Sequence, residues 1–213
     1  MKRLIVGISG ASGAIYGIRM LEILKPIVGV ETHLVMSRYA RLTIEIETTH
    51  TPGEVEALAD VVHTLGNQAA SISSGSFKTD GMVIAPCSIN TLSGIAHSAA
   101  NNLLVRAADV VLKERRPLVL MPREVPLHVG HCKLLYEVAQ LGAVISPAIP
   151  AFYNQPKTID DIINHSVGRV LDLFDLDTGT LKRWEGINSR SDKPQENEEI
   201  DGSKTSYKVI GTK

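Results

Sequence analysis

A glycine-rich stretch near the start of the chain has the composition of an anion-binding turn. Gly7, Gly10 and Gly13 stand where a short aliphatic run gives way to a helical pattern, and glycines let backbone amides approach a ligand closely. Ser9 and Ser12 add hydroxyl donors. The alternative is a turn that only joins a strand to a helix. We expect the strand, turn and helix together to hold a phosphate-bearing cofactor.

The spacing of these glycines disfavours a dinucleotide. It is G-x-x-G-x-x-G, whereas the dinucleotide fingerprint is G-x-G-x-x-G. The second aliphatic run, 32–36, leads into Ser37 and lacks the acid that would bind a ribose. The sequence therefore indicates a phosphate ligand other than NAD.

A second polar cluster, in PCSINTLSGIAHS, follows Pro86. Ser88, Asn90 and Thr91 precede an apolar helical pattern, and the free amides and dipole of a helix N-terminus favour an anion. A phosphate seat and simple N-capping by Ser88 are both compatible with this spacing. We expect Cys87 to be a small buried apolar residue rather than a nucleophile.

Charged residues flank the aliphatic run 118–121. Arg123 and Glu124 follow it after Pro122, and ligands of doubly wound sheets bind at the carboxyl ends of strands, so this pair suits an anion clamp and a proton donor. The charges at 113–116 precede the run, and we interpret them as a solvated helix end. His128, His131 and Cys132 lack convincing further ligands, so we expect no metal.

Alternating short aliphatic runs and helical patterns predict an α/β fold, with a mainly parallel sheet and helices on both faces. Helices are expected at 14–24 and at 159–174, the second opened by Thr158 and Asp161 as an approximate capping box. Strands are expected at 4–8, 32–36, 82–85, 118–121 and 143–145.

Length and composition limit the class of protein. The 213 residues suit one domain, which we place at 1–187, and the polar stretch 188–213 is predicted to be a disordered tail. A net charge of -1 and a pI of about 6.7 argue against nucleic acid or an anionic membrane as partner. No run approaches the ~20 apolar residues that cross a bilayer. Two cysteines and the lack of a signal peptide favour the cytoplasm.

Six ordered motifs resemble the flavin prenyltransferases, the UbiX-like family. They run through about residues 1–184, and the long block ending in PRE is the most specific. SGSFKTDGM and AFYNQP most resemble members that accompany hydroxyarylic acid decarboxylases and are often named as a subunit of those enzymes. The motifs are GASGAIYG, SGS, MVIAPCSINTLSGIA, NNLLVRAADVVLKERRPLVLMPRE, LGAVISPAIPAFYNQP and the RW at 183–184.

The resemblance implies a flavodoxin-like or Rossmann-like doubly wound fold and a specific reaction. Members transfer a dimethylallyl group from dimethylallyl monophosphate to N5 and then C6 of reduced FMN. The prenylated flavin serves a UbiD-like decarboxylase of aromatic acids. Members need no metal and form large homo-oligomers, commonly dodecamers, with active sites at subunit interfaces.

The resemblance also implies roles for single residues. Glu47 and Glu124 match the catalytic carboxylates, Glu47 acting with Ser12 near flavin N5 and Glu124 exchanging protons with the phosphate. The prenyl phosphate is expected to bind Tyr153 and Arg169, assisted by Lys113, which we also count as catalytic, and by Arg106, while Trp184 walls the prenyl pocket. FMN is expected to contact Gly10, Ala11, Ser12, Ser37, Ser88, Ile89, Asn90, Thr91 and Arg123.

The stretch HVGHCKLLYEV departs from the usual family pattern after PRE, although His131 still matches a histidine there. Two alternatives stay open. An FMN-dependent cysteine-type decarboxylase would share the fold, but its PxMNxxMW-type motif and early catalytic histidine are not found in the sequence. A non-catalytic accessory subunit of a hydroxyarylic acid decarboxylase would co-purify with that enzyme and form no product alone.

Overall fold

The computed structural model describes residues 1–179, 181, 183, 184 and 186. The chain divides into one compact unit, 1–182, and a second unit, 183–213, of which Arg183, Trp184 and Gly186 are described. The predicted polar tail, 188–213, lies outside the described residues, and the predicted domain boundary stays a prediction.

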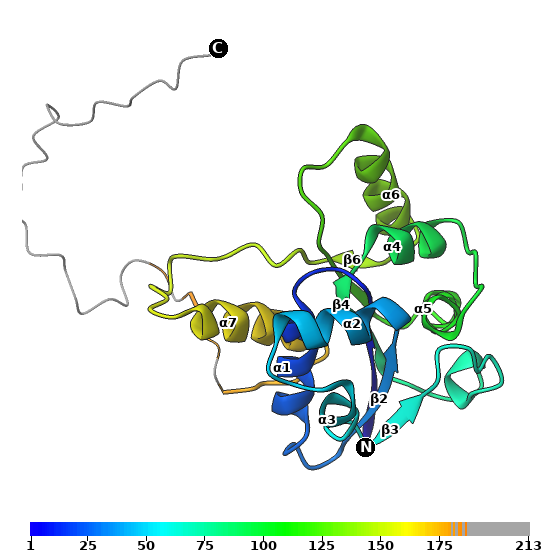
Figure 1. Ribbon diagram of the computed structural model, residues 1–213, viewed down its shortest axis with the longest axis horizontal. Coiled ribbons are helices and arrows are strands. Elements are labelled where there is room, and N and C mark those ends of the chain that lie inside the picture. Colours follow the sequence, from blue (N-terminus) through cyan, green and yellow to red (C-terminus); the bar gives the residue numbers. More distant parts are fainter. Residues whose placement is uncertain (180, 182, 185, 187–213) are drawn as a thin grey trace, which may run out of the picture. The chain divides into compact units, whose positions relative to one another are not determined.

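The compact unit is built on a six-stranded sheet in the order β3-β2-β1-β4-β5-β6, in which neighbouring strands run parallel. The chain starts at the centre, winds outward to β3, returns to β4 beside β1 and winds out the other way (Figure 1). This is the order of a doubly wound Rossmann-like sheet, and the predicted α/β class is confirmed. The strands are β1 Lys2–Ile8, β2 Val30–Met36, β3 Val61–His63, β4 Gly81–Cys87, β5 Leu118–Pro122 and β6 Val144–Ile145.

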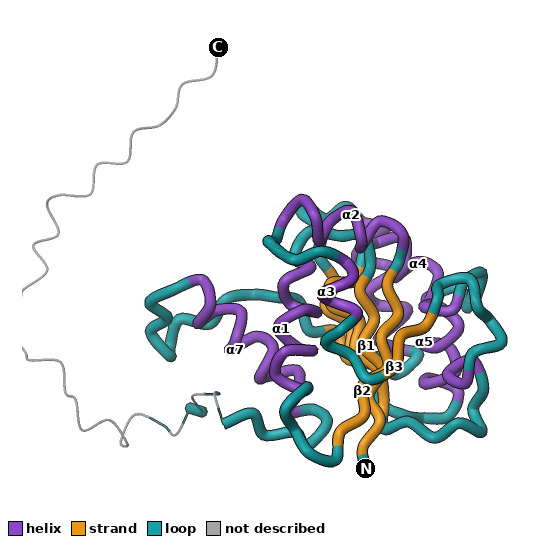
Figure 2. Tube along the Cα trace, turned by 60° about the horizontal axis from the view of Figure 1, so that its bottom comes forward, coloured by secondary structure: helices purple, strands orange, loops and turns teal. Residues whose placement is uncertain are grey.

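Helices cover both faces of the sheet (Figures 1 and 2). One core cluster lies under α1, α2, α3 and α7, and a second lies under α4, α5 and α6. The helices are α1 Ala14–Leu24, α2 Arg38–Glu47, α3 Pro52–Glu56, α4 Ile89–Ala96, α5 Leu103–Lys113, α6 Val129–Gln140 and α7 Ile159–Asp172, with a 3-10 turn at Ser71–Ser73.

The central strands are aliphatic because both of their faces are covered. Every residue of β4 is buried, as are the last five of β1 and of β2, which is the pattern of a parallel sheet between two helical layers. The helix α1 approaches β4 so closely that a Cβ on Gly17 would lie 2.4 Å from the carbonyl oxygen of Ala85. A small residue is therefore required on this side of α1.

Several predicted boundaries differ from the structure. The sequence predicts an end of β4 before Pro86, but the strand continues to Cys87, with a shift of register between Ile84 and Cys87 and a cis Ala85–Pro86 bond. α7 begins where predicted and has the Thr158–Asp161 capping box, but it ends at Asp172 rather than 174. β3, α2 and α3 were not predicted.

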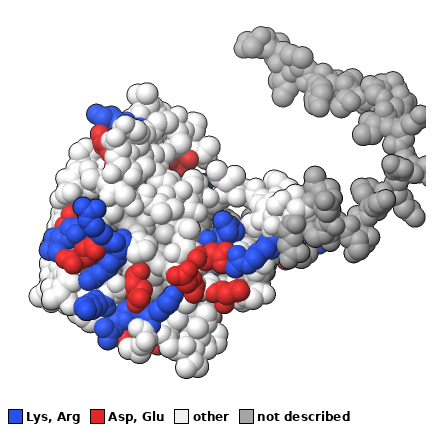
Figure 3. All heavy atoms as spheres, turned by 180° about the vertical axis from the view of Figure 1, so that it is seen from behind, with Lys and Arg blue, Asp and Glu red and all other residues white. Residues whose placement is uncertain are grey.

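The surface carries mixed charge. On the face seen in Figure 3, basic and acidic side chains lie next to one another. Within the part of the chain that the structure describes, no helix has both the length and the apolar character needed to span a membrane.

Candidate active site

The carboxyl ends of β1, β2, β4 and β5 form a continuous rim, held together by hydrogen bonds between the loops that follow them. Ser9, just after β1, is fully buried. Its hydroxyl donates to the Pro86 carbonyl oxygen (2.8 Å) and accepts from the Ser88 amide (2.7 Å). One side chain thus joins the loops after β1 and β4, at the point where the order of the sheet reverses. In sheets of this type, that is where ligands bind.

The loop after β2 joins the rim on the other side of β1. The Ser37 amide donates to the Ile8 carbonyl oxygen (2.9 Å), and the Ser37 hydroxyl caps α2 by accepting from the Ala40 amide (3.0 Å). Gly10 lies against this turn, because a Cβ there would be 2.3 Å from Cβ of Tyr39. Only glycine lets the first loop approach α2 this closely.

Glu47, at the end of α2, reaches the N-terminus of α1. Its Oε2 accepts from the amides of Gly13 (2.7 Å) and Ala14 (3.4 Å). Gly13 has a φ of 99° and no side chain to cap the helix, so an exposed carboxylate from another helix takes that place. Ser12 lies in the same half-buried turn. The structure therefore brings Glu47 and Ser12 to one loop.

The Ser88–Thr91 turn opens α4. The Ser88 hydroxyl accepts from the Thr91 amide (3.3 Å) and donates to its hydroxyl (3.1 Å), so the N-capping alternative is observed. Ile89 and Asn90 form the first turn, where helix geometry leaves amides without an intrahelical acceptor. Capping orders the turn and still leaves those amides at the rim for an anion.

Cys87 is fully buried beneath this turn, and burial raises the pKa of its thiol to about 12. A thiol with that pKa is protonated at neutral pH and is a poor nucleophile. The prediction that Cys87 is a buried apolar residue is confirmed.

Arg123 and Glu124 close the rim at the end of β5. The Arg123 amide donates to the Cys87 carbonyl oxygen (3.1 Å), which places this loop beside the start of α4. Both side chains are exposed, and Glu124 accepts from the amide of Val125 (3.1 Å). A cation and a carboxylate are therefore present next to the helix N-terminus.

Tyr153 and Arg169 are connected through a residue that the sequence analysis did not name. The Tyr153 hydroxyl lies 2.9 Å from Nε2 of His165 on α7. Arg169 follows one turn later on the same helix and pairs with Asp172 (3.2 Å). The position of His165, four residues before a predicted ligand on a helix, was the signal that could have identified it.

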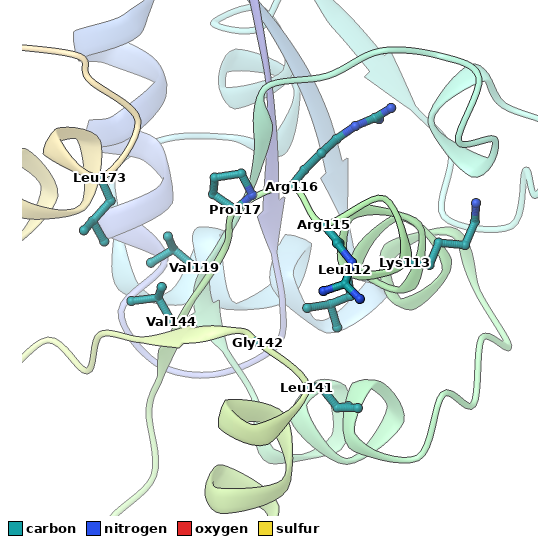
Figure 4. Close-up of a pocket in the computed structure, with 10 residues that line it drawn as sticks. All are labelled: Leu112, Lys113, Arg115, Arg116, Pro117, Val119, Leu141, Gly142, Val144 and Leu173. Atoms are coloured by element: carbon teal, nitrogen blue, oxygen red, sulfur yellow. The ribbon is translucent and has the colours of Figure 1, made fainter.

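Lys113 does not join the rim within one chain. Lys113 ends α5 before β5 begins, whereas Arg123 follows β5, so the two lie at opposite edges of the sheet. Lys113 pairs with Glu114 and borders a cavity of about 590 Å³ with an aliphatic wall that includes Val119 and Val144 (Figure 4). Arg106 pairs with Asp109 (2.8 Å).

The charged segment 113–116 is more than a solvated helix end. Arg116 donates to the carbonyl oxygens of Gly75 (2.8 Å) and Phe77 (2.9 Å), and so anchors the loop before β4. Trp184, by contrast, belongs to the second unit, where the residue is 54% exposed, and its role stays a prediction.

Nothing in the described residues forms a group of three or more His, Cys, Asp or Glu side chains able to hold a metal ion. His128 caps α6 by accepting from the Gly130 amide (3.0 Å), and its ring packs 3.6 Å from that of His131, centroid to centroid. These histidines have a local structural role.

The sheet is doubly wound, and helix N-termini and hydroxyls gather where the order of its strands reverses. This arrangement is typical of a nucleotide- or flavin-binding protein. A family model described as Flavoprotein matches residues 1–171. The flavin prenyltransferase UbiX of Salmonella typhimurium is 62% identical over 188 residues, which are 87% of this chain and 100% of the relative.

Two solved structures are similar over nearly the same range. A dodecameric FMN-dependent UbiX-like decarboxylase from Escherichia coli O157:H7 has a TM-score of 0.85 at 52% identity, covering 86% of this chain and 100% of that chain. A UbiX protein (PadA1) in complex with FMN and dimethylallyl pyrophosphate has a TM-score of 0.85 at 51% identity, covering 87% of this chain and 98% of that chain. The chain belongs to the UbiX family of flavin prenyltransferases.

Proposed function

We propose that this protein transfers a dimethylallyl group from dimethylallyl monophosphate to N5 and C6 of reduced FMN. The prenylated FMN then serves a UbiD-like aromatic acid decarboxylase. The observation that carries the proposal is the rim, where Ser9 joins the loops after β1 and β4 and the Ser37 amide joins the loop after β2 to β1. The N-termini of α1, α2 and α4 therefore lie together at the carboxyl ends of neighbouring strands. Relatives at 61% and 62% identity are named flavin prenyltransferases, which disfavours the cysteine-type decarboxylase.

The residues at the rim fit FMN. Gly10 lets the first loop pack against Tyr39 at the start of α2, and so brings the backbone of this loop to the rim beside Ser37. Ser37 and the Ser88–Thr91 turn supply hydroxyls and amides for a phosphate, with Ile89 and Asn90 in the first turn of α4. Ala11 and Ser12 continue the first loop, and Arg123 adds a cation. When bound, FMN supplies the nucleophilic N5 and C6.

The prenyl donor is assigned to Tyr153 and Arg169. Breaking the bond between the dimethylallyl carbon and the phosphate oxygen leaves an allylic cation and a phosphate that carries one more negative charge than the ester did. A guanidinium and a neutral phenol donor stabilise the charge that develops on that phosphate.

Lys113 and Arg106 are assigned to the site of a neighbouring copy. Lys113 lies at the edge of the sheet opposite the rim, so it can assist the same phosphate only from another subunit. A homo-oligomer provides this arrangement, and one structural relative is a dodecamer. We propose a dodecamer with sites between subunits.

Two carboxylates are assigned to proton transfer. Glu124 would carry a proton from the phosphate to the double bond of the prenyl group, so that the electron-deficient carbon left there bonds to C6, and would then accept the proton that leaves C6. Glu47, whose carboxylate accepts from the Gly13 amide, and Ser12 are assigned to carrying away the proton lost from N5. Neither step requires a metal.

A cytoplasmic location completes the proposal. Cys87 and Cys132 are free thiols, which reducing compartments maintain. The accessory-subunit alternative keeps the same fold and differs only in chemistry.

The assignment of Glu124 is tested with Glu124→Gln, which keeps the shape and removes the exchangeable proton. We expect FMN affinity to be unchanged and the rate of ring closure to fall by about a hundredfold or more, the usual contribution of a general acid or base. Single-turnover assays with reduced FMN and dimethylallyl monophosphate, followed by flavin absorbance, measure that rate. Closure at the wild-type rate would show that Glu124 is not the proton carrier.

A further inference from the structure

His165 contacts the tyrosine that is assigned to the prenyl phosphate. Nε2 of His165 lies 2.9 Å from the Tyr153 hydroxyl, and the two rings meet edge to face with centroids 5.5 Å apart. The contact joins the segment before α7 to the second turn of that helix. This contact holds the Tyr153 phenol in place against α7.

The surroundings of His165 keep its ring neutral. Burial lowers the pKa of His165, and the nearby charge of Arg169 lowers it further. Tyr153 and Arg169 face it, and Lys157 and Asp161 line with it a cavity of about 310 Å³. At neutral pH the imidazole therefore has one N–H donor and one acceptor nitrogen.

The tautomer of His165 sets what Tyr153 can offer a ligand. A phenol has one hydrogen to donate and can also accept. If Nε2 carries the imidazole hydrogen, it donates to the Tyr153 oxygen, and the phenol hydrogen points to another acceptor. A phosphate oxygen is such an acceptor, and Arg169 one turn away attracts the same anion.

We propose that His165 is a positioning residue that orients the Tyr153 hydroxyl toward the phosphate of the prenyl donor. The inference rests on the proposed function, because it needs Tyr153 at the phosphate. It adds a residue of α7 that acts only through Tyr153.

Three variants separate this role from support of the fold. His165→Phe keeps an aromatic ring and removes the donor, His165→Gln keeps an N–H at a similar reach, and Ser166→Ala is a control on the next residue of α7. Loss of one oriented hydrogen bond costs about 1.4 kcal/mol, so we expect KM for dimethylallyl monophosphate to rise about tenfold in His165→Phe. His165→Gln should recover most of that loss, and FMN affinity should not change in any variant.

The decisive readout is a double-mutant cycle with Tyr153→Phe. If His165 acts through the Tyr153 hydroxyl, His165→Phe has no further effect on KM once that hydroxyl is gone. An equal rise of KM in both backgrounds would overturn the inference, as would an unchanged KM in His165→Phe with wild-type Tyr153. Absence of product from the wild-type protein would instead overturn the proposed function and the inference with it.

Discussion

Ser9 shows how much of the site depends on one hydroxyl. It is buried and bonds to the Pro86 carbonyl oxygen near the end of β4 and to the Ser88 amide in the turn that follows. The sequence identified it only as a possible donor to a ligand. In the structure both of its hydrogen bonds are made within the protein, and its contribution is to hold the ligand-binding loops in register.

Replacing Ser9 by alanine should therefore destabilise the protein and weaken flavin binding together. The Ser88 amide loses its acceptor, and the Pro86 carbonyl oxygen keeps only the backbone amide of residue 9 (3.2 Å) as a donor, which costs about 1–3 kcal/mol in the free energy of unfolding. Urea denaturation and FMN titration measure the two effects. Ser76→Ala removes an exposed hydroxyl and should shift stability by less than about 0.5 kcal/mol. Equal effects from the two variants would contradict the role given to Ser9.

At the scale of elements, the contact between α1 and β4 sets the geometry of the first loop. Gly17 is the closest point, since a Cβ added there would lie 2.4 Å from the Ala85 carbonyl oxygen, and α1 begins directly after the loop. Any displacement of α1 moves Gly13 and the amides beside it.

Gly17→Ala should thus cost about 1–3 kcal/mol of stability, because the added methyl group forces helix and strand apart. Gly53→Ala on α3 is the matched control, since a Cβ added there would meet no atom within 4 Å. Alanine there should be neutral or stabilise by up to about 1 kcal/mol. Thermal or urea unfolding of both variants measures the difference, and a neutral Gly17→Ala would refute the tight contact.

The strongly periodic elements were predictable, and the short or tertiary ones were not. α1 was predicted with its bounds, because a glycine turn and an apolar stripe mark it. β3 has three residues, too few for a period to show, and α2 buries only Ala40 and Ile44. Among site residues, the glycines of the first loop indicate a turn by their spacing alone, whereas the contact of His165 with Tyr153 forms only when the chain folds.

The positions of Lys113 and Arg123 on either side of β5 already indicate that they lie apart. Lys113 precedes β5 and Arg123 follows it, so a parallel strand must separate them. This rule alone places the lysine away from the rim of its own chain.

At the scale of the whole molecule, stability should depend on pH through a histidine pair on β2 and β3. His33 is buried, its Nδ1 lies 2.9 Å from Nε2 of His63, and Glu31, Arg3 and Asp60 are the nearby charges. Burial lowers the pKa of both imidazoles, and the charge of His33 lowers that of His63 further.

The sign of the effect follows from proton binding. The unfolded histidines bind protons near their ordinary pKa of 6.5, while the folded pair resists protonation. The histidine pair therefore leaves the free energy of unfolding constant well above pH 6.5 and lowers it as the pH falls below that value. Urea unfolding at about pH 7.5 and about pH 5.5 should show a loss that shrinks in the His33→Gln, His63→Gln double variant. The same loss in both proteins would contradict the assignment.

The central claim is that this chain prenylates FMN by itself, and the mass of the flavin tests it most directly. Purified protein is incubated without oxygen with reduced FMN and dimethylallyl monophosphate, and the flavin is analysed by mass spectrometry beside a reaction that lacks protein. We predict a flavin heavier by one five-carbon prenyl unit, with release of one phosphate for each flavin converted. FMN that binds to the protein and keeps its mass would contradict the claim and favour an accessory subunit.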